Sequence, residues 1–407
     1  MIDKNNILQG YKNSVVGIIP EEWDVKTFSE LGSTLSTNTL SRDMMNEESG
    51  YALNIHYGDV LVKYGEILNC SKINIPWINY EYAENNLGAQ LKDGDVVISD
   101  TAEDYSVGKV TELQGISNAK VFSGLHTIAY RPNKNIFSQR FLGYYFNSSI
   151  YRKQLYPLIQ GIKVCSISKS AISKTKLAIP PLAEQKKIAE ILCTWDDAIE
   201  KQSKLIEKLE LRKRGLMQRL LTGKTRLPGF TEPWINIRIG ELCLMKRGEI
   251  LVSDDYIFGD IPVVAGGKEP AGFHNVSNRN GNIITISSSG ASAGFVAFYE
   301  KPIFATDCFT ISSSEKYNVR FLYYYLMMSQ ERIYRLQSGG AQPHVHPKDL
   351  APMMLIIPSL EEQNAVVKII LSSDKEIEIQ RKKLEALRQQ KQALMQQLLI
   401  GKTRVRI

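Results

Sequence analysis

The chain has 407 residues, of which 43% are hydrophobic, and a net charge of +7 with a pI of about 8.9. This length predicts two or three domains with their own cores, and the lack of a long apolar run excludes a membrane-spanning helix. The first residues, MIDKNNILQG, lack the apolar stretch expected of a signal peptide, and the five cysteines show no Cys-x-x-Cys pair, so we expect a cytoplasmic protein with reduced thiols and no zinc site.

The positive charge is concentrated in two segments. Residues 182–226 hold 11 Lys/Arg against 7 Asp/Glu, and residues 360–407 hold 10 against 6. The rest of the chain is therefore close to neutral. A basic balance fits a nucleic-acid partner, but any DNA-binding surface outside these two segments must be a local patch.

Residues 1–180 are predicted to form a first globular domain of mixed α and β structure. It opens with a Trp-to-Leu motif, Trp23–Leu31, that follows a proline-containing turn. Short strands separated by Gly and Asp turns are expected at 59–63, 95–99 and 121–130. The aromatic residues of 141–146 have helical spacing, which favours a place in the core over stacking on nucleic-acid bases.

Residues 181–226 are predicted to form a long central helix. Its apolar residues recur at alternating spacings of three and four, which is the pattern of a coiled coil. The predicted seam is Ile188, Leu192, Trp195, Ile199, Gln202, Ile206, Leu209, Lys213, Leu216 and Leu220. The polar members Gln202 and Lys213 cost stability and favour one register. A helix that packs only on its own globular domain stays an alternative.

Residues 227–358 are predicted to form a second globular domain, opened by Trp234–Leu242, which resembles the first opening motif. Strands are expected at 282–287 and 294–299, joined by a Gly- and Ser-rich loop that would let a ligand approach the backbone closely. Any tight hairpin has the same composition, so this loop alone does not decide between binding and structure. A second aromatic helix is expected at 321–326.

A polar loop precedes the long helix in each half of the chain, at 161–170 and at 339–346. The Lys, Ser, Gln and His side chains of such loops suit DNA phosphates or base edges. The candidate DNA-binding residues of the two domains are Lys163, Ser168, Lys169, Ser170, Lys268, Arg279, Ser288, Ser289, Gln342, His344 and His346. The two histidines have no acidic or Cys residue close by in sequence, so no metal site is predicted.

Residues 359–407 contain a second long helix that repeats the first. At an offset of 178 residues, 24 of the 50 positions in 177–226 are identical to their counterparts, which indicates an internal duplication. The second seam, interrupted by Ser373, is Val366, Ile370, Ile377, Gln380, Leu384, Leu387, Lys391, Leu394 and Leu398. Ser359 and Glu362 predict a capping box at the helix start. A duplicated helix most simply pairs with its own copy, antiparallel, about a pseudo-two-fold axis.

Both helices end in the same motif, LLTGKTR at 220–226 and LLIGKTR at 398–404. A phosphate-binding P-loop would need an earlier glycine, which is missing, and a helix that begins at the motif instead of ending there. Gly223 and Gly401 are therefore predicted to be C-terminal caps. The basic residues after them, Lys224, Arg226, Lys402 and Arg404, would lie near the negative end of each helix dipole.

The chain contains no G-x-S-x-G, no H-E-x-x-H and no Asn-Pro-Pro-Tyr motif, so no catalytic residue is predicted. The two I-P-x-L-x-E-Q helix starts (179–185 and 357–363), the repeated GKTR ends and the two Trp-to-Leu motifs instead resemble the specificity subunits of type I restriction–modification systems. The resemblance covers nearly the whole chain. It implies a mixed α/β fold with two target-recognition domains joined by two long antiparallel coiled-coil helices.

The resemblance also implies the partners and their chemistry. Two methyltransferase (modification) subunits would bind the helices and methylate adenine N6 with S-adenosylmethionine. Restriction subunits would add ATP-driven translocation and nuclease activity. No cofactor is expected in this chain, because S-adenosylmethionine, ATP and Mg²⁺ would belong to the partner subunits. Double-stranded DNA is the expected ligand, and no membrane is involved.

Two unlike domains on a pseudo-two-fold scaffold predict an asymmetric, bipartite DNA target with an unread gap. Two-fold readers place their half-sites about one helical turn, roughly 10 bp, apart, and the long helices would set that gap. Flipping a base for methylation would fall to a partner. Two other classes stay open: a reader that is fused to or serves a different nuclease or methyltransferase, and a coiled-coil adaptor with no DNA role.

Overall fold

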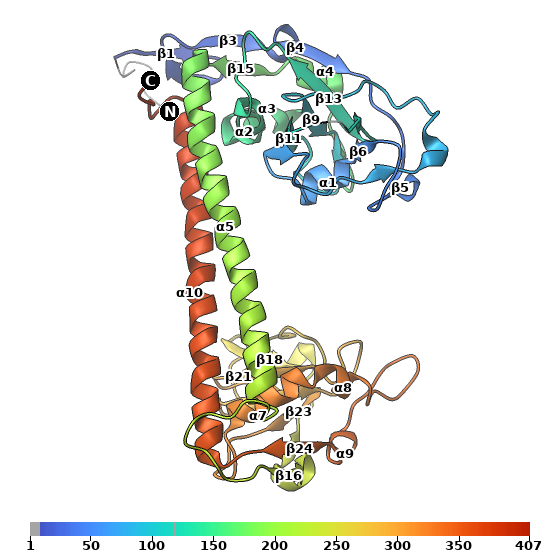
Figure 1. Cartoon of the computed structure of the whole chain (residues 1–407), viewed down its shortest axis with the longest axis vertical. Helices are drawn as coiled ribbons and strands as arrows, with labels where there is room; N and C mark the ends of the chain where they lie inside the picture. The colour runs from blue at the N-terminus through green and yellow to red at the C-terminus, as the bar shows by residue number, and fades with distance from the viewer. Residues whose placement is uncertain (1–8, 118) are drawn as a thin grey trace. The chain divides into compact units, whose positions relative to one another are not determined.

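The structure of the protein is a computed structural model that describes residues 9–117 and 119–407 (Figure 1). It separates into two compact units, Met1–Lys201 with Leu384–Ile407, and Gln202–Lys383. Both boundaries fall inside the long helices α5 (Leu182–Leu220) and α10 (Leu360–Leu399). Each unit therefore contains one globular head and one segment of each long helix.

The head of the first unit is built on two sheets that share a core. The larger has the order β4-β13-β9-β11-β7, and only its β11–β7 pair is parallel. Its strands are β4 (Gly32–Leu35), β7 (Ile67–Asn69), β9 (Val96–Ser99), β11 (Val110–Gln114) and β13 (Thr127–Pro132). The smaller, of order β12-β6-β8-β5, consists of β5 (Met45–Asn46), β6 (Leu53–Ile55), β8 (Trp77–Ile78) and β12 (Val121–Ser123).

Short helices and two small ladders complete this head. The helices are α1 (Tyr57–Val62), α2 (Phe141–Asn147), α3 (Ser149–Leu155) and α4 (Lys169–Ser173). The ladders are the hairpin of β1 (Tyr11–Ser14) with β2 (Gly17–Pro20), and β10 (Thr101–Ala102) with β14 (Cys165–Ser166). Phe141, Tyr144 and Tyr145 of α2 are fully buried, which confirms that the aromatic helix belongs to the core.

The head of the second unit is also built on two sheets. The four-stranded sheet has the antiparallel order β17-β23-β20-β21, with β17 (Met245–Arg247), β20 (Ile283–Ser287), β21 (Val296–Tyr299) and β23 (Cys308–Ile311). The three-stranded sheet consists of β18 (Ile261–Val264), β19 (Gly272–His274) and β22 (Phe304–Ala305). The helices are α6 (Ile239–Leu242), α7 (Val319–Met328), α8 (Gln330–Tyr334) and α9 (Pro347–Leu350). The aromatic residues Phe321 and Tyr324 of α7 are again core.

The duplicated opening motifs have the same structural role in both units. In the first unit, β3 (Asp24–Thr27) pairs antiparallel with β15 (Lys176–Ile179), the strand just before α5. In the second unit, β16 (Ile235–Arg238) pairs antiparallel with β24 (Met354–Ile357), the strand just before α10. Each opening motif therefore ties the beginning of a head to the beginning of a long helix.

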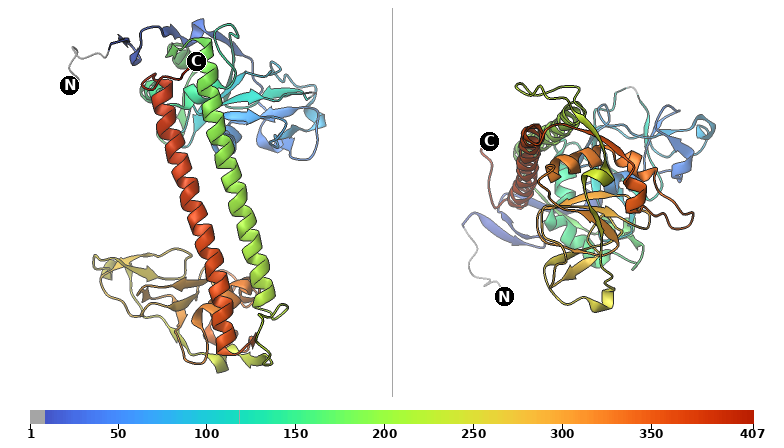
Figure 2. Two further views of the ribbon diagram at one scale, coloured as in Figure 1. Left: turned by 60° about the vertical axis from the view of Figure 1, so that its left-hand side comes forward. Right: turned by 90° about the horizontal axis from the view of Figure 1, so that it is seen from below.

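In each unit the segments of α5 and α10 lie side by side and run antiparallel (Figure 2). Every residue of the predicted seam is buried or half-buried. The seam amide Gln202 donates from Nε2 to Oε1 of its repeat counterpart Gln380 at 2.9 Å. Gly223 and Gly401 have φ values of 70° and 69° just beyond the two helix ends, which confirms left-handed caps at both positions.

Three local predictions differ from the structure. Residues 59–63, expected as a strand, lie mostly in α1, where the ring of His56 accepts a hydrogen bond from Gly58 N and caps the helix. Residues 121–130 form two strands, β12 and β13, separated by a turn at His126, whose φ is 55°. Glu362, expected in a capping box, directs its carboxylate to Arg226 and Trp234. No helix of the described residues is both long and apolar enough for a membrane span.

Candidate nucleic-acid interface

A buried glutamate closes the first unit where α5 begins and α10 ends. Glu184, only 1% exposed, accepts a hydrogen bond from Trp23 Nε1 at 2.9 Å and two from Arg404, at 2.8 Å from Nε and 3.0 Å from Nη2. These hydrogen bonds to Glu184 raise the pKa of Arg404 further above its usual value. Arg404 also reaches Glu22 at 2.5 Å. The last residues of the chain are thereby fixed to the first head.

The second unit contains the same arrangement at repeat-equivalent positions. Glu362, also 1% exposed, accepts from Trp234 Nε1 at 3.1 Å and from Arg226 at 3.1 and 2.6 Å. The Glu of each I-P-x-L-x-E-Q helix start thus binds the Arg of the GKTR end of the other helix. The two repeated motifs are the halves of one clamp, which sequence inspection did not reveal.

A seam lysine forms a second shared contact in each unit. In the first, Lys391 Nζ lies 2.6 Å from Asp196 and 2.9 Å from Glu66, and 5.2 Å from the ring centre of Tyr144. Burial opposes the charged ammonium, but the carboxylates of Glu66 and Asp196 outweigh it and raise the pKa of Lys391. The hydroxyl of Tyr144 donates to Asp196.

Among the described residues, the equivalent cluster of the second unit has no counterpart of Glu66. Lys213 pairs with Asp374, and its Nζ lies 5.4 Å from the ring centre of Tyr324. The hydroxyl of Tyr324 donates to Asp374 at 2.5 Å. A polar seam residue that has a charged partner at only one position of the facing helix fixes the register of the pair. The two lysines therefore set the alignment of α5 and α10 within their units.

The two heads share a backbone frame where three loops meet at the end of a central strand. In the first head these are the loop after β9, the turn before β13 and the loop before α4. Four backbone hydrogen bonds hold them: Gly108 N to Ser99 O (2.8 Å), Asp100 N to His126 O (3.1 Å), Ile167 N to Asp100 O (2.9 Å) and Ser166 N to Gln160 O (2.8 Å). Gly108 has φ of 80°, as the tight turn requires.

The second head repeats this frame after β20, before β23 and before α9. Its four bonds are Gly294 N to Ser287 O (2.8 Å), Ser288 N to Asp307 O (3.1 Å), Val345 N to Ser288 O (3.0 Å) and His344 N to Ser338 O (2.8 Å). Gly294 takes φ of 85° and corresponds to Gly108. We call this place the loop corner. Its side chains are Thr101, His126 and Ser166 in the first head and Ser289, Asp307 and His344 in the second.

The chain matches the sequence model of the type I restriction modification DNA specificity domain twice, over residues 20–211 and 231–389. The chain belongs to this type I specificity family. Each match contains one head and most of one long helix, so the family's repeat is the duplication seen in the clamps, the seam lysines and the loop corners.

Individual relatives agree with this membership. The chain is 26% identical to a putative type I restriction enzyme MjaX specificity subunit of Methanocaldococcus jannaschii, over 98% of this chain and 97% of that protein. Its fold is similar to the type I restriction–modification S subunit of M. genitalium, with a TM-score of 0.58 at 19% identity over 93% of this chain and 96% of that one. A chain from a structural study of type I R-M complex assembly gives a TM-score of 0.62 at 18% identity, over 95% and 99%.

The candidate DNA-binding residues of this specificity-family chain fall into groups. In the first head, Lys163, Ser168, Lys169 and Ser170 are all exposed, and Ser168 caps α4 by accepting from Ala171 N at 3.1 Å. In the second head, Lys268 and Gln342 are exposed, and Ser288, Ser289, His344 and His346 are half-buried around the loop corner. The rings of His344 and His346 stack, with centres 5.9 Å apart and planes at 8°.

Arg279, predicted with this group, lies in the interior. Its side chain is 5% exposed, and its guanidinium donates to Glu249 at 3.0 Å, to Thr310 at 3.1 Å and to two backbone carbonyls. The structure instead adds His126 and Asp307 to the exposed surface of the corners. No motif marks these two residues, and the only sequence signal was the Asp or Gly turn next to each strand.

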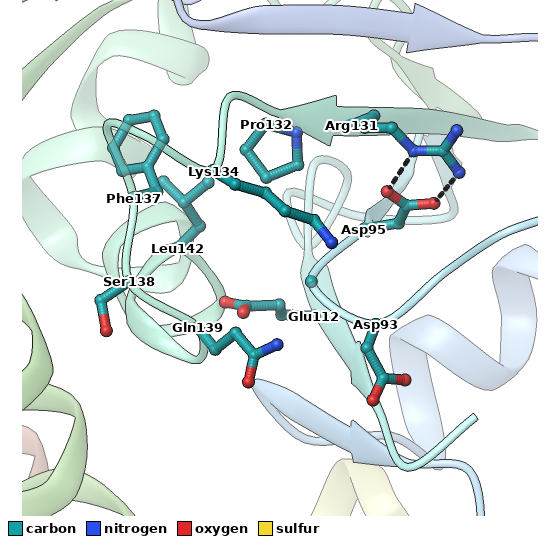
Figure 3. A pocket seen from close by; sticks show the side chains of 11 residues that line it. Asp93, Asp95, Glu112, Arg131, Pro132, Lys134, Phe137, Ser138, Gln139 and Leu142 are labelled. Atoms are coloured by element: carbon teal, nitrogen blue, oxygen red, sulfur yellow. Dashed lines mark hydrogen bonds and ion pairs between the residues drawn. The ribbon is translucent and has the colours of Figure 1, made fainter. Parts of the chain in front are cut away.

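The first head also has a partly open cavity of about 230 Å³, lined in part by charged side chains, between β11, the loop after β13 and α2 (Figure 3). Glu112 points into it, where the carboxylate accepts from the backbone amides of Arg140 and Gly143 (2.9 Å) at the start of α2. Burial raises the pKa of Glu112 to about 7, although those amides oppose the shift. At the cavity's other side Arg131 binds Asp95 through two hydrogen bonds of 2.8 and 2.5 Å. Glu112 thus acts as a helix cap whose charge depends on pH near neutrality.

Proposed function

We propose that this chain is the DNA sequence-recognition subunit of a type I restriction–modification complex, and that each head reads one half of an asymmetric, bipartite target. The observation that carries the proposal is the shared frame with unlike side chains. Two heads with the same loop corner but different hydrogen-bonding groups would approach duplex DNA in the same way and read different bases. We take residues 1–180 and 227–358 as the target-recognition domains, and 181–226 and 359–407 as the helical regions.

The chemistry of modification and cleavage is assigned to partner subunits. The relative from M. jannaschii is described as a specificity subunit of a restriction enzyme, and no catalytic motif occurs in this sequence. We expect two methyltransferase subunits, which use S-adenosylmethionine to methylate adenine N6, and restriction subunits with ATP-driven translocation and Mg²⁺-dependent nuclease activity. This assignment predicts that the chain itself is non-catalytic and acts in the cytoplasm.

The long helices are assigned the docking of the methyltransferase subunits and the spacing of the two half-sites. Buried clamps and paired seam lysines make each helix segment a fixed part of its unit, which suits a spacer. Insertion of one helical turn at equivalent places in α5 and α10 should therefore lengthen the unread gap and leave the bases of both half-sites unchanged. An unchanged gap would contradict the spacing role.

The experiment that tests the proposal is a domain exchange. Residues 243–354 are replaced by the second head of another type I specificity subunit, and methylated adenines are mapped across the genome of cells that carry the assembled complex. We expect one half-site to change and the other to stay as in the wild type. If both halves change, or neither does, the heads are not independent readers.

Two simpler measurements address the other classes. DNA cleavage by the purified chain with Mg²⁺ alone would favour a reader fused to its own nuclease. A coiled-coil adaptor without a DNA role would leave the assembled complex with no salt-sensitive DNA binding. A DNA reader loses affinity steeply as salt rises, because each phosphate contact releases condensed counterions.

A further inference from the structure

The loop corners of the two heads share four backbone hydrogen bonds and exchange their functional groups. The backbone itself differs at one position, because His126 has a φ of 55° whereas Asp307 is not among the described non-glycine residues with positive φ. A hydroxyl stays at the first position, as Thr101 in one head and Ser289 in the other. At the second position His126 corresponds to Asp307, because each carbonyl accepts the same backbone hydrogen bond. At the third position Ser166 corresponds to His344, by the same criterion. Such positions can vary while the shared backbone hydrogen bonds are kept.

A buried serine lies behind each corner. Ser99 Oγ donates to the carbonyl of Thr101 at 2.8 Å. Ser287 Oγ donates to the carbonyl of Gly266 at 2.6 Å and lies 3.4 Å from the carbonyl of Ser289. The varying groups lie outside this layer.

The exposed group of the first corner is an imidazole. The His126 side chain is 47% exposed, and its Nδ1 lies 3.3 Å from Thr101 Oγ1. That hydroxyl donates to Asp100 at 2.9 Å, and the same carboxylate lies 3.6 Å from Nδ1. Nδ1 is thus engaged with Thr101 and Asp100, and Nε2 is the ring atom left for an outside group. An imidazole Nε2 can present a lone pair or a proton.

The exposed group of the second corner is a carboxylate. Asp307 is exposed and accepts the hydroxyl proton of Ser289. A Cβ on Gly266 would lie 2.9 Å from Asp307 Oδ2, so glycine lets this loop pass close to the carboxylate. Lys268 of the same loop is exposed. A carboxylate offers only acceptors, so its choice of partner is narrower than that of His126.

We propose that His126 and Asp307 are specificity-determining residues of the two heads, and that Asp307 selects a base with an exocyclic amino group. This inference rests on the proposed DNA-reading function. In the major groove only cytosine N4 and adenine N6 donate from an amino group, whereas guanine and thymine present acceptors at that edge. The Asp307 carboxylate therefore accepts from cytosine or adenine on the strand it faces, and it repels guanine and thymine there.

The test uses the complete complex assembled with its modification subunits. A duplex library with randomised half-sites is methylated, and the selected sequences are read out for the wild type and for Asp307→Asn, His126→Asn and Glu315→Gln. An amide both donates and accepts, so Asp307→Asn should lose about 5- to 150-fold of discrimination at one base pair of the second half-site, equivalent to one good base contact. His126→Asn should alter the first half-site only.

Glu315 is a matched control, because it is an exposed acid that follows β23 whereas Asp307 precedes that strand. Its substitution should leave both half-sites unchanged. The head exchange at 243–354 assigns each half-site to its head. A thermal melt of each variant checks folding. Asp307→Ser is a second variant, which removes the carboxylate acceptor altogether.

Outcomes separate the inference from the function on which it rests. A wild-type complex without sequence-selective methylation overturns the proposed function. The inference alone is overturned if the wild-type complex reads a bipartite motif and the variants Asp307→Asn and Asp307→Ser select the same motif with undiminished discrimination. The inference also fails if Asp307→Asn alters the first half-site instead of the second.

Discussion

The clamp around Glu184 leads to a quantitative prediction about stability. Arg404→Ala removes two of the three hydrogen bonds that this carboxylate accepts and leaves only that from Trp23 Nε1. Glu184 is 1% exposed, so the variant keeps a buried carboxylate without its countercharge. The first unit should therefore unfold more readily, although the change lies at the opposite end of the sequence from most of that unit.

The magnitude follows from burial. Breaking a buried ion pair by removing one partner costs about 3–5 kcal/mol. The side chain of Arg404 is 37% exposed, so water can enter the vacated space and hydrate Glu184 in part, which places the expected loss at the lower end, about 3 kcal/mol. For a folding unit of this size 1 kcal/mol shifts Tm by about 2–4 °C, so the expected decrease is about 6–12 °C.

Scanning calorimetry of the full chain measures this shift, and the chain provides its own controls. Arg406→Ala removes an exposed arginine two residues further on and should change Tm by less than about 2 °C. Arg226→Ala breaks the equivalent clamp of the second unit. Arg404→Lys keeps the charge but loses the forked geometry, so it should fall between wild type and Arg404→Ala. If Arg404→Ala has the same Tm as Arg406→Ala, the clamp does not stabilise the unit and the reasoning is refuted.

Two further predictions concern a glycine pair and a titrating carboxyl. Gly401→Ala should lower the urea midpoint more than Gly223→Ala. Both positions have left-handed φ, but the added Cβ would lie 2.4 Å from Pro20 carbons at position 401 and 3.4 Å from the Trp234 ring at position 223. Equal decreases of the urea midpoint in the two variants would contradict this prediction. For Glu112, the folded pKa of about 7 lies above the unfolded value of 4.5, so stability falls as pH rises through that window, by up to about 3 kcal/mol. Glu112→Gln should flatten the Tm profile between pH 5 and 8, and an unaltered slope would exclude Glu112 as its source.

The long helices were predictable from sequence because their signals are local and repeated. The seam spacing, the Gly223 and Gly401 caps and the duplication all follow from residues a few positions apart or from a constant offset. The role of Arg226 and Arg404 was not predictable in this way, because the helix-dipole argument considers only the adjacent helix end. Their partners, Glu362 and Glu184, lie 136 and 220 residues away.

The heads were less predictable for two physical reasons. Short apolar runs do not distinguish strand from helix, and at 59–63 the local cap by His56 favoured the helix. The loop corners depend on three segments that only tertiary structure brings together, and the heads differ in length between their shared motifs. The equivalence of His126 and Asp307 therefore follows from the backbone hydrogen bonds of the structure and could not be found by aligning the sequences of the two heads. Arg279 shows the converse, because a basic residue in a polar stretch became a buried framework group.

The last turns of α10 have a consequence for biosynthesis. Met395, Leu398 and Leu399 belong to the core of the first unit, and Arg404 completes its clamp. The second unit, Gln202–Lys383, is contiguous and has all its residues once position 383 leaves the ribosome. At about 5–20 residues per second, the N-terminal head waits roughly 10–40 s for the roughly 200 residues that follow Lys201. The unit whose head is translated first is therefore completed after the unit whose residues lie between its two segments.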